Sequence, residues 1–118
     1  MTNFYLYITI IYGMFIELNL EDIEGFDWNE ANIKKNEIKH NVYYKECEQV
    51  FFDKPFYIRD IKHSKIEKRF YVFGETTKKR SLIITFTIRT RKIRVITARN
   101  QDKKEKEFYK NNYYKLSK

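Results

Sequence analysis

The sequence predicts an α+β fold with two N-terminal helices, an antiparallel meander of about four strands and a C-terminal helix. Three observations predict this order. Asn29 and Asn41 mark the ends of a first helix, which a second, short helical segment follows up to residue 52. Four runs of β-branched and aromatic residues come next between 56 and 98, and helical spacing returns from 102 to 112. The four runs are consecutive and are joined by polar segments, as in a meander.

The charge of the chain is positive and unevenly distributed. Its 118 residues carry a formal net charge of +8 at pH 7. Up to Asp53 there are 4 basic and 10 acidic residues, and from Lys54 onward there are 20 basic and 6 acidic residues. A single lysine is easily explained as solvated surface, but a half as basic as this one is typical of proteins that bind a polyanion. Nucleic acid is the first candidate.

Composition indicates one folded domain without a cofactor. Aromatic residues make up 18% of the chain, which is enough apolar surface for a core although 34% of the residues are charged. The single cysteine, Cys47, excludes an internal disulfide, and no cluster of His and Cys offers a metal site, so a reduced cytoplasm is the expected compartment. On a helix Cys47 lies on the side of Val50 and Phe51, which predicts a small buried side chain and not a nucleophile.

Residues 1–25 are expected to form an extension to a single domain at 26–114, with a tail at 115–118. Phe4–Ile16 is almost entirely apolar or aromatic. It is nevertheless shorter than the roughly 20 residues of a membrane helix, and no Lys or Arg precedes it as in a signal peptide, so no membrane association is expected. Its β-branched content favours a strand, while Met14 stands where an internal start codon could lie. An added edge strand, a flexible extension and an overlong gene model remain open.

Capping residues mark the expected helix ends. Asn29 is expected to cap the first helix, and Asn41 to end it in a left-handed conformation. The apolar positions of this helix are Ala31, Ile33 and Ile38. A second helix is expected over residues 43–52, with a first turn that frays because Tyr43 stands where a Ser would cap it. Asp102 is expected to cap the last helix, which runs to Asn112.

The second half of the chain predicts the strands. Their expected bounds are Phe56–Arg59, Arg69–Gly74, Leu82–Ile88 and Lys92–Ala98. In the third strand the two faces differ. One face carries Leu82, Ile84, Phe86 and Ile88, and the other carries Ser81, Ile83, Thr85 and Thr87. The first face is therefore expected to be core and the second only half so.

Several motifs succeed one another along the chain. They are Phe26-Asp27-Trp28-Asn29-Glu30-Ala31, Asn36, Lys39-His40, Val50-Phe51-Phe52-Asp53 and Arg94-Val95-Ile96-Thr97-Ala98-Arg99. From about Phe26 to about Tyr109 the chain resembles the BrnT family of toxins from bacterial toxin-antitoxin pairs. The resemblance implies the small scaffold shared with RelE and ParE toxins, and a basic ribonuclease that damages RNA in its own cell until a BrnA-like antitoxin covers it. It further implies that promoter DNA is bound only by the complex with the antitoxin, and a homodimer remains open.

RNA is cleaved without a metal when a base takes the proton of the 2′-OH, cations stabilise the phosphorane and an acid protonates the leaving 5′-oxygen. The candidates for these catalytic roles are Lys39, His40, His63, Glu67, Arg69 and Arg80. Histidines titrate near neutrality, so His40 and His63 suit the acid and the base, although His40 at a helix end also suits capping or packing. Glu67 and Arg69 are two residues apart and project from one face of a strand, where they either serve the reaction or form a plain surface ion pair.

The candidates for RNA binding are Arg89, Arg94, Arg99, Lys103 and Lys104. Arginine suits planar phosphate contacts. Because Arg94 and Arg99 differ by five, they are expected on opposite sides of a regular strand. The two lysines suit non-specific RNA contact or plain solubility. Trp28 is expected in the core, and Tyr71 is a weak candidate for base stacking.

The leading hypothesis is a cytoplasmic toxin that cleaves RNA by acid-base and arginine chemistry, without a metal, and arrests growth until its antitoxin binds. The alternative is a non-catalytic basic module that grips nucleic acid or a protein target, as the ParE relatives act by binding an enzyme. Arginines on strands serve both classes. An RNA-cleavage assay with a chelator present distinguishes them.

Overall fold

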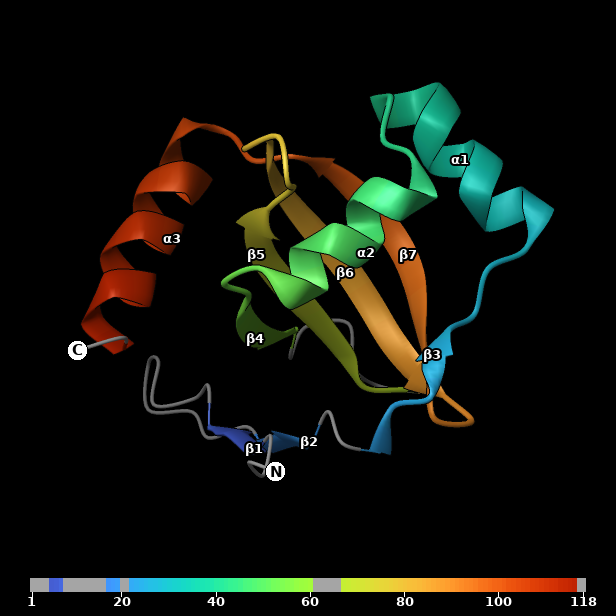
Figure 1. Cartoon of the computed structure of the whole chain (residues 1–118), viewed down its shortest axis with the longest axis horizontal. Coiled ribbons are helices and arrows are strands. Elements are labelled where there is room, and N and C mark those ends of the chain that lie inside the picture. The colour runs from blue at the N-terminus through green and yellow to red at the C-terminus, as the bar shows by residue number, and fades with distance from the viewer. Residues whose placement is uncertain (1–4, 8–16, 20–21, 61–66, 117–118) are drawn as a thin grey trace.

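The computed structural model describes residues 5–7, 17–19, 22–60 and 67–116, and it confirms the α+β class (Figure 1). The helices are α1 (Glu30–His40), α2 (Tyr44–Phe52) and α3 (Lys103–Leu116). The strands are β1 (Tyr5–Tyr7), β2 (Glu17–Asn19), β3 (Gly25–Phe26), β4 (Phe56–Asp60), β5 (Arg69–Glu75), β6 (Ser81–Arg89) and β7 (Lys92–Asn100). The four predicted strands are all present, each one or two residues longer than expected.

The main sheet has five strands in the order β3-β7-β6-β5-β4, so the prediction of a purely antiparallel sheet of about four strands is wrong in detail. The meander β4 to β7 is antiparallel, but β3 is added parallel to β7 through the pairs Gly25 with Lys92 and Phe26 with Ile93. A two-residue strand has no alternating pattern to find. Strands β1 and β2 pair only with each other in a separate sheet, so three short strands precede the helices that were expected to come first.

Helix α1 begins and ends where the sequence predicts. Asn29 Oδ1 accepts a hydrogen bond from Asn32 N at 2.9 Å, and Asn32 Oδ1 accepts one from Asn29 N at 2.8 Å. Asn41 adopts the left-handed conformation that ends the helix. The inner face is polar, however. Asn32 and Asn36 are buried whereas Ile38 is 80% exposed, so asparagines and not the apolar positions form the buried side of this helix.

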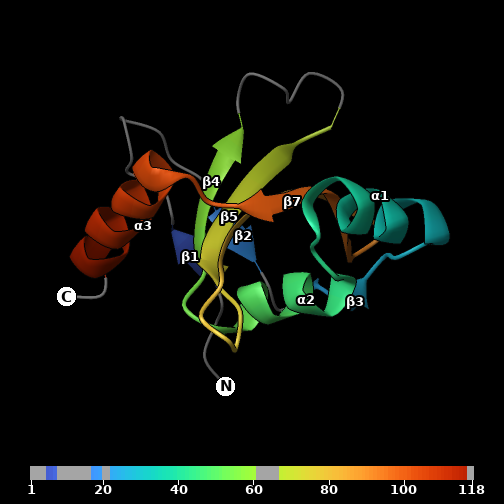
Figure 2. The same cartoon turned by 90° about the horizontal axis from the view of Figure 1, so that it is seen from above.

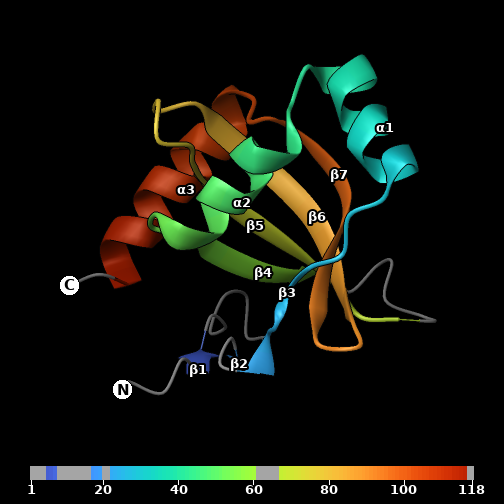
Figure 3. The ribbon, with the colours of Figure 1, turned by 45° about the vertical axis from the view of Figure 1, so that its right-hand side comes forward.

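An extra residue in β7 explains the polar face of α1. Thr85 of β6 pairs with Thr97, but the next residue, Phe86, pairs with Val95, so Ile96 forms a β-bulge. Beside the bulge, Ala98 N donates to Asn36 Oδ1 at 3.0 Å. Helix α1 thus covers the part of the outer edge of β7 that β3 does not reach (Figure 3).

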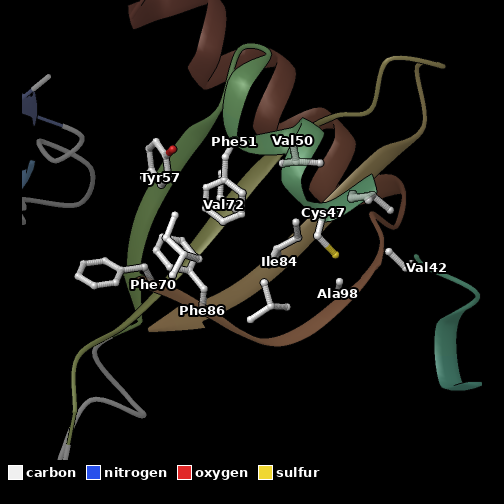
Figure 4. Packing of buried hydrophobic residues seen from close by; sticks show 13 residues of the cluster. Val42, Cys47, Val50, Phe51, Tyr57, Phe70, Val72, Ile84, Phe86 and Ala98 are labelled. Atoms are coloured by element: carbon white, nitrogen blue, oxygen red, sulfur yellow. The ribbon is translucent and has the colours of Figure 1, made fainter. Parts of the chain in front are cut away.

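Helix α2 packs its apolar side on the sheet (Figure 4). Cys47, Val50 and Phe51 are buried, which confirms the prediction that Cys47 is a small core side chain. Burial raises the pKa of its thiol to about 12. The helix lies so close to β5 that a Cβ at Gly74 would be 2.9 Å from Cγ1 of Val50, so only glycine fits there. At the start of the helix, Glu46 Oε1 accepts from Tyr43 N at 3.0 Å, and the Tyr43 side chain makes no cap.

The two faces of the sheet carry different cores. Leu82, Ile84 and Phe86 lie in the main cluster under α2, as their alternation predicts. Ile83, on the other face, packs with Phe56 and Phe73 beneath α3. Figure 2 shows α3 on the opposite side of the sheet from α1 and α2. Asp102 caps α3 as expected, since its Oδ1 accepts from the backbone N of the third helical residue at 2.8 Å.

We predict that Asn36→Ala lowers the free energy of unfolding by about 1–3 kcal/mol, because it leaves the buried N–H of Ala98 without its acceptor. Chemical denaturation of the purified protein measures the change. Lys34→Ala, at an exposed position of the same helix, is the control and should change stability by less than about 0.5 kcal/mol. Equal stability of the two variants would show that the bulge does not depend on Asn36.

Candidate functional site

The sheet face turned away from α1 and α2 carries a band of polar side chains. The strand register aligns Asp60, Arg69, Thr87 and Arg94 in one row, and Ile58, Tyr71, Thr85 and Thr97 in the next. Helix α3 packs on the third row through Phe108, which contacts Phe56 and Phe73. We call Arg69, Tyr71, Thr85, Thr87, Arg94 and Thr97 the polar sheet face. It carries two guanidinium groups, one phenol and three threonines from three neighbouring strands; Thr87 is buried and its hydroxyl donates to the carbonyl of Lys68 at 2.8 Å.

The bulge overturns one expectation about this face. A regular strand would place Arg94 and Arg99 on opposite sides. With Ile96 as the extra residue, Arg94 pairs with Thr87 and Arg99 with Ile83, and these two partners lie four residues apart on one face of β6. Both arginines therefore lie on the same side of the sheet as Arg69.

Asp60 and Tyr71 form a hydrogen-bonded pair beside Arg69. Asp60 is buried at the end of β4, and Tyr71 is half-buried on β5. Burial, followed by the hydrogen bond that its hydroxyl donates to Asp60, raises the pKa of Tyr71. The phenol therefore stays protonated near neutral pH and can act as a donor. Sequence reasoning gave Asp60 no role and Tyr71 only stacking, because their proximity depends on the pairing of β4 with β5.

Glu67 lies just before β5, but its partner is not Arg69. Arg89, at the end of β6, donates to Glu67 from Nε at 3.0 Å and from a terminal nitrogen at 3.3 Å. That hydrogen bond, with smaller contributions from Arg69 and Arg94, lowers the pKa of Glu67. The predicted neighbour relation of Glu67 and Arg69 is thus secondary to an exposed ion pair with Arg89. A carboxylate with a lowered pKa is a weak base.

Arg99 is committed to holding α3. Its two terminal nitrogens donate to the two carboxylate oxygens of Glu105 at 2.7 Å each. Glu105 also accepts from the backbone N of Asp102 at 2.9 Å, so the ion pair fixes the first turn of the helix. The hydrogen bond between the two side chains raises the pKa of Arg99 and lowers that of Glu105.

Arg80 lies on the other side of the sheet, at the turn between α1 and α2. Its Nε donates to Asn100 Oδ1 at 2.8 Å. One terminal nitrogen donates to the carbonyl of Asn41 at 2.8 Å and to Glu46 at 3.0 Å, and the other donates to the carbonyl of His40 at 3.2 Å. The guanidinium therefore joins the end of α1, the start of α2 and the end of β7.

The structure accordingly divides the predicted catalytic set. Arg69 lies on the polar sheet face, whereas Arg80 and His40 lie at the α1–α2 turn together with Lys39, which is exposed. His63 lies outside the described residues. Among the predicted RNA-binding residues, Arg94 lies on the polar sheet face, and Lys103 and Lys104 are exposed in the first turn of α3.

Trp28 belongs to the core, as predicted. It packs against the main cluster, and its Nε1 donates to Glu48 at 2.9 Å. In the described part of the chain, no three His, Cys, Asp or Glu side chains gather as a metal site. Within the same residues, no helix combines the length and the apolar character needed to cross a membrane.

A small basic α+β protein with arginines on one face of its sheet belongs to the class of proteins whose charge suits a polyanion such as RNA. The family model of the ribonuclease toxin BrnT, of type II toxin-antitoxin systems, matches residues 28–105. The match covers more than half of the chain, from Trp28 to the first turn of α3, so the chain belongs to the BrnT family. The resemblance seen in its motifs is thereby confirmed, and with it an antitoxin partner and an RNA substrate as family traits. No curated protein matches the chain.

We predict that Arg80→Ala lowers the free energy of unfolding by about 2–3 kcal/mol, because it removes donors from two helix-end carbonyls and leaves Glu46, whose side chain is 26% exposed, without its partner. Denaturant titration measures the loss. Arg80→Lys should recover only a small part of it, since one ammonium cannot reach all four acceptors. The control is Arg91→Ala, where the ion pair with Glu24 is exposed and should contribute less than about 0.5 kcal/mol.

We also predict an acid-sensitive contribution from the ion pair between Arg99 and Glu105. Because the folded-state pKa of Glu105 lies below its usual 4.5, the contribution is complete above about pH 4.5 and is lost as the pH falls through the folded-state value. Melting temperatures of the wild type and Glu105→Gln should differ at pH 7 and converge as the pH falls below the lowered folded-state pKa of Glu105. Glu107→Gln, at an exposed position of the same helix, should follow the wild type at every pH.

Proposed function

We propose that this protein is a metal-independent endoribonuclease that binds RNA across the polar sheet face and arrests growth until its antitoxin covers that face. One observation carries the proposal: Arg69, Thr87 and Arg94 stand in one row across three strands, beside the hydrogen-bonded pair Asp60 and Tyr71. The row lies on a face that α1 and α2 do not cover. Side chains fixed on strands suit a reaction that needs phosphate held in one position.

The catalytic roles assigned to this row need no side chain from the face of the sheet that α1 and α2 cover. Arg69 stabilises the negative charge that develops on the phosphorane, and Arg94, two strands away, holds the neighbouring phosphate of the RNA. Tyr71 has a single O–H, which it donates to Asp60 in the resting protein; when RNA binds, this O–H turns to the departing 5′-oxygen and passes its proton to it. We assign the base that takes the 2′-OH proton to His63, because an imidazole is the side chain best suited to accept a proton near neutral pH.

The charge distribution supports the same substrate. The half of the chain from Lys54 onward contains the meander and α3 and holds 20 of the 24 Lys and Arg residues. We assign Lys103 and Lys104 to weak contacts with the RNA backbone outside the row. Lys39, His40 and Arg80 are assigned to the fold of the α1–α2 turn, not to catalysis. The toxin acts in the cytoplasm and binds promoter DNA only together with the antitoxin.

We predict that Arg69→Ala reduces RNA cleavage at least about a hundredfold, because it removes a charge that stabilises the phosphorane, and that Arg94→Ala, which removes a contact to the neighbouring phosphate, reduces it less. Both variants should remain folded at the assay temperature. Cleavage of an RNA substrate with a chelator present measures the first effect, and thermal melting the second. Arg69→Lys should restore activity only in part, since a point charge replaces a two-pronged contact. Arg91→Ala serves as the matched arginine control. Stable variants with undiminished cleavage would remove both residues from the site, and a wild type that binds but never cleaves RNA would leave only a binding module.

We further predict that RNA binding weakens steeply with salt. Each neutralised phosphate of a single strand contributes a slope of roughly −0.7 to the logarithm of affinity against the logarithm of salt concentration. Several contacts on the basic half should therefore give a slope of about −2 or steeper, measured by fluorescence anisotropy with a labelled RNA. A flat titration between low and physiological ionic strength would contradict an electrostatic mode of binding.

A further inference from the structure

A pocket opens where α1 meets the bulged edge of β7. Its volume is about 240 Å³. The lining residues are Asn29, Ala31, Asn32, Lys35, Arg94, Val95 and Ile96. None of these residues is needed for the reaction at the row except Arg94, which lines the pocket and also stands in the row. Arg94 is thus the one side chain shared by the polar sheet face and the pocket.

The pocket has the charges of a phosphate site. Lys35 is exposed and held over the bulge, because its Nζ donates to the carbonyl of Ile96 at 3.3 Å. Arg94 approaches from the strand, and its nearest carboxylate, Asp27, is 3.5 Å away in a contact that is long for an ion pair of arginine. The first turn of α1, which lines the pocket at Ala31, adds the positive end of the helix dipole, opposed by Glu30 in the same turn. Two cations from separate elements therefore face one hollow.

The positions of Arg69, Arg94 and Lys35 define a path for bound RNA across the strands. On neighbouring strands the backbones lie about 4.8 Å apart, so Arg69 on β5 and Arg94 on β7 are separated by about 10 Å across β6. A chain of phosphates that starts at Arg69 and crosses the strands next meets Arg94. Beyond β7 no strand of the described chain continues the sheet at this level, because β3 pairs only with Lys92 and Ile93, and Lys35 of α1 comes next.

We propose that this pocket binds a backbone phosphate of the RNA that flanks the cleaved bond, held between Arg94 and Lys35, so that the RNA runs across the strands from β5 toward α1. The proposal rests on the proposed function and deepens it. The bulge at Ile96 serves this site twice, since it turns Arg94 onto the polar sheet face and presents the carbonyl that positions Lys35.

Lys35→Ala tests the proposal against Lys34→Ala, a lysine one position earlier in the same helix. The loss of one flanking contact should raise KM for a long RNA at least about fivefold, with kcat changed less than about twofold, because the contact is the same in the ground state and the transition state. The salt slope of RNA binding should also become shallower by about 0.7, the value of one phosphate. Lys34→Ala should do neither. Identical behaviour of the two variants would overturn the proposal.

Asp27→Asn should change KM in the opposite direction. It removes the carboxylate that competes for Arg94, and KM should fall by about twofold or more, with melting temperature measured alongside.

RNA substrates shortened by one nucleotide at a time from either end provide the last test. The effect of Lys35→Ala should vanish once the flanking phosphate is removed from one end, and an effect that persists in the shortest cleavable RNA would overturn the placement. A wild type that neither binds nor cleaves RNA would refute the proposed function itself, whereas cleavage without any Lys35 effect refutes only the pocket.

Discussion

The outer edge of β7 is the constraint on which the structure depends. It is shared between two elements: β3 pairs with its first two residues, and α1 covers the bulge and the residues after it. At Ala98, β7 is the edge of the sheet, and the outward N–H of this residue donates to Asn36. Because this acceptor comes from a helix side chain, α1 is positioned by polar contacts and can leave Ile38 exposed. The same extra residue sets the direction of every side chain before it in the strand, Arg94 included.

Some arginines of this small protein hold the fold together and others are available to bind RNA, and their hydrogen bonds distinguish the two groups. Arg80 and Arg99 each donate to acceptors at 3.2 Å or less from two or more residues. Arg80 joins elements about forty residues apart, and Arg99 joins β7 to the helix that follows it. Arg94 has only a long contact with Asp27 among the described residues. Holding a guanidinium firmly within the fold uses the donors that a phosphate would need. A basic surface alone therefore does not identify the residues that meet RNA.

The parts of the fold that could be predicted are those determined by residues close together in the sequence. The four long strands coincide with runs of β-branched residues, and the ends of α1 are set by Asn29 and Asn41, whose side chains or backbones act within a few residues. The bulge at Ile96 could not be predicted, because it is a property of the register between two strands and has no signature in one of them. For that reason alone, the prediction that the side chains of Arg94 and Arg99 lie on opposite sides of the sheet was wrong. Likewise, Arg80 finds its acceptors at His40 and Asn41, about forty positions away, and no spacing rule reaches that far.

Cys47 gives the molecule a built-in reporter. It is the single thiol of the chain, it is buried between α2 and the sheet, and burial keeps it in the unreactive protonated form. A thiol reagent can reach it only when α2 lifts from the sheet, so the rate of labelling of the unmodified protein measures how often that opening occurs. Because no residue has to be replaced, the opening of the free toxin and of its complex with the antitoxin can be compared on the same polypeptide.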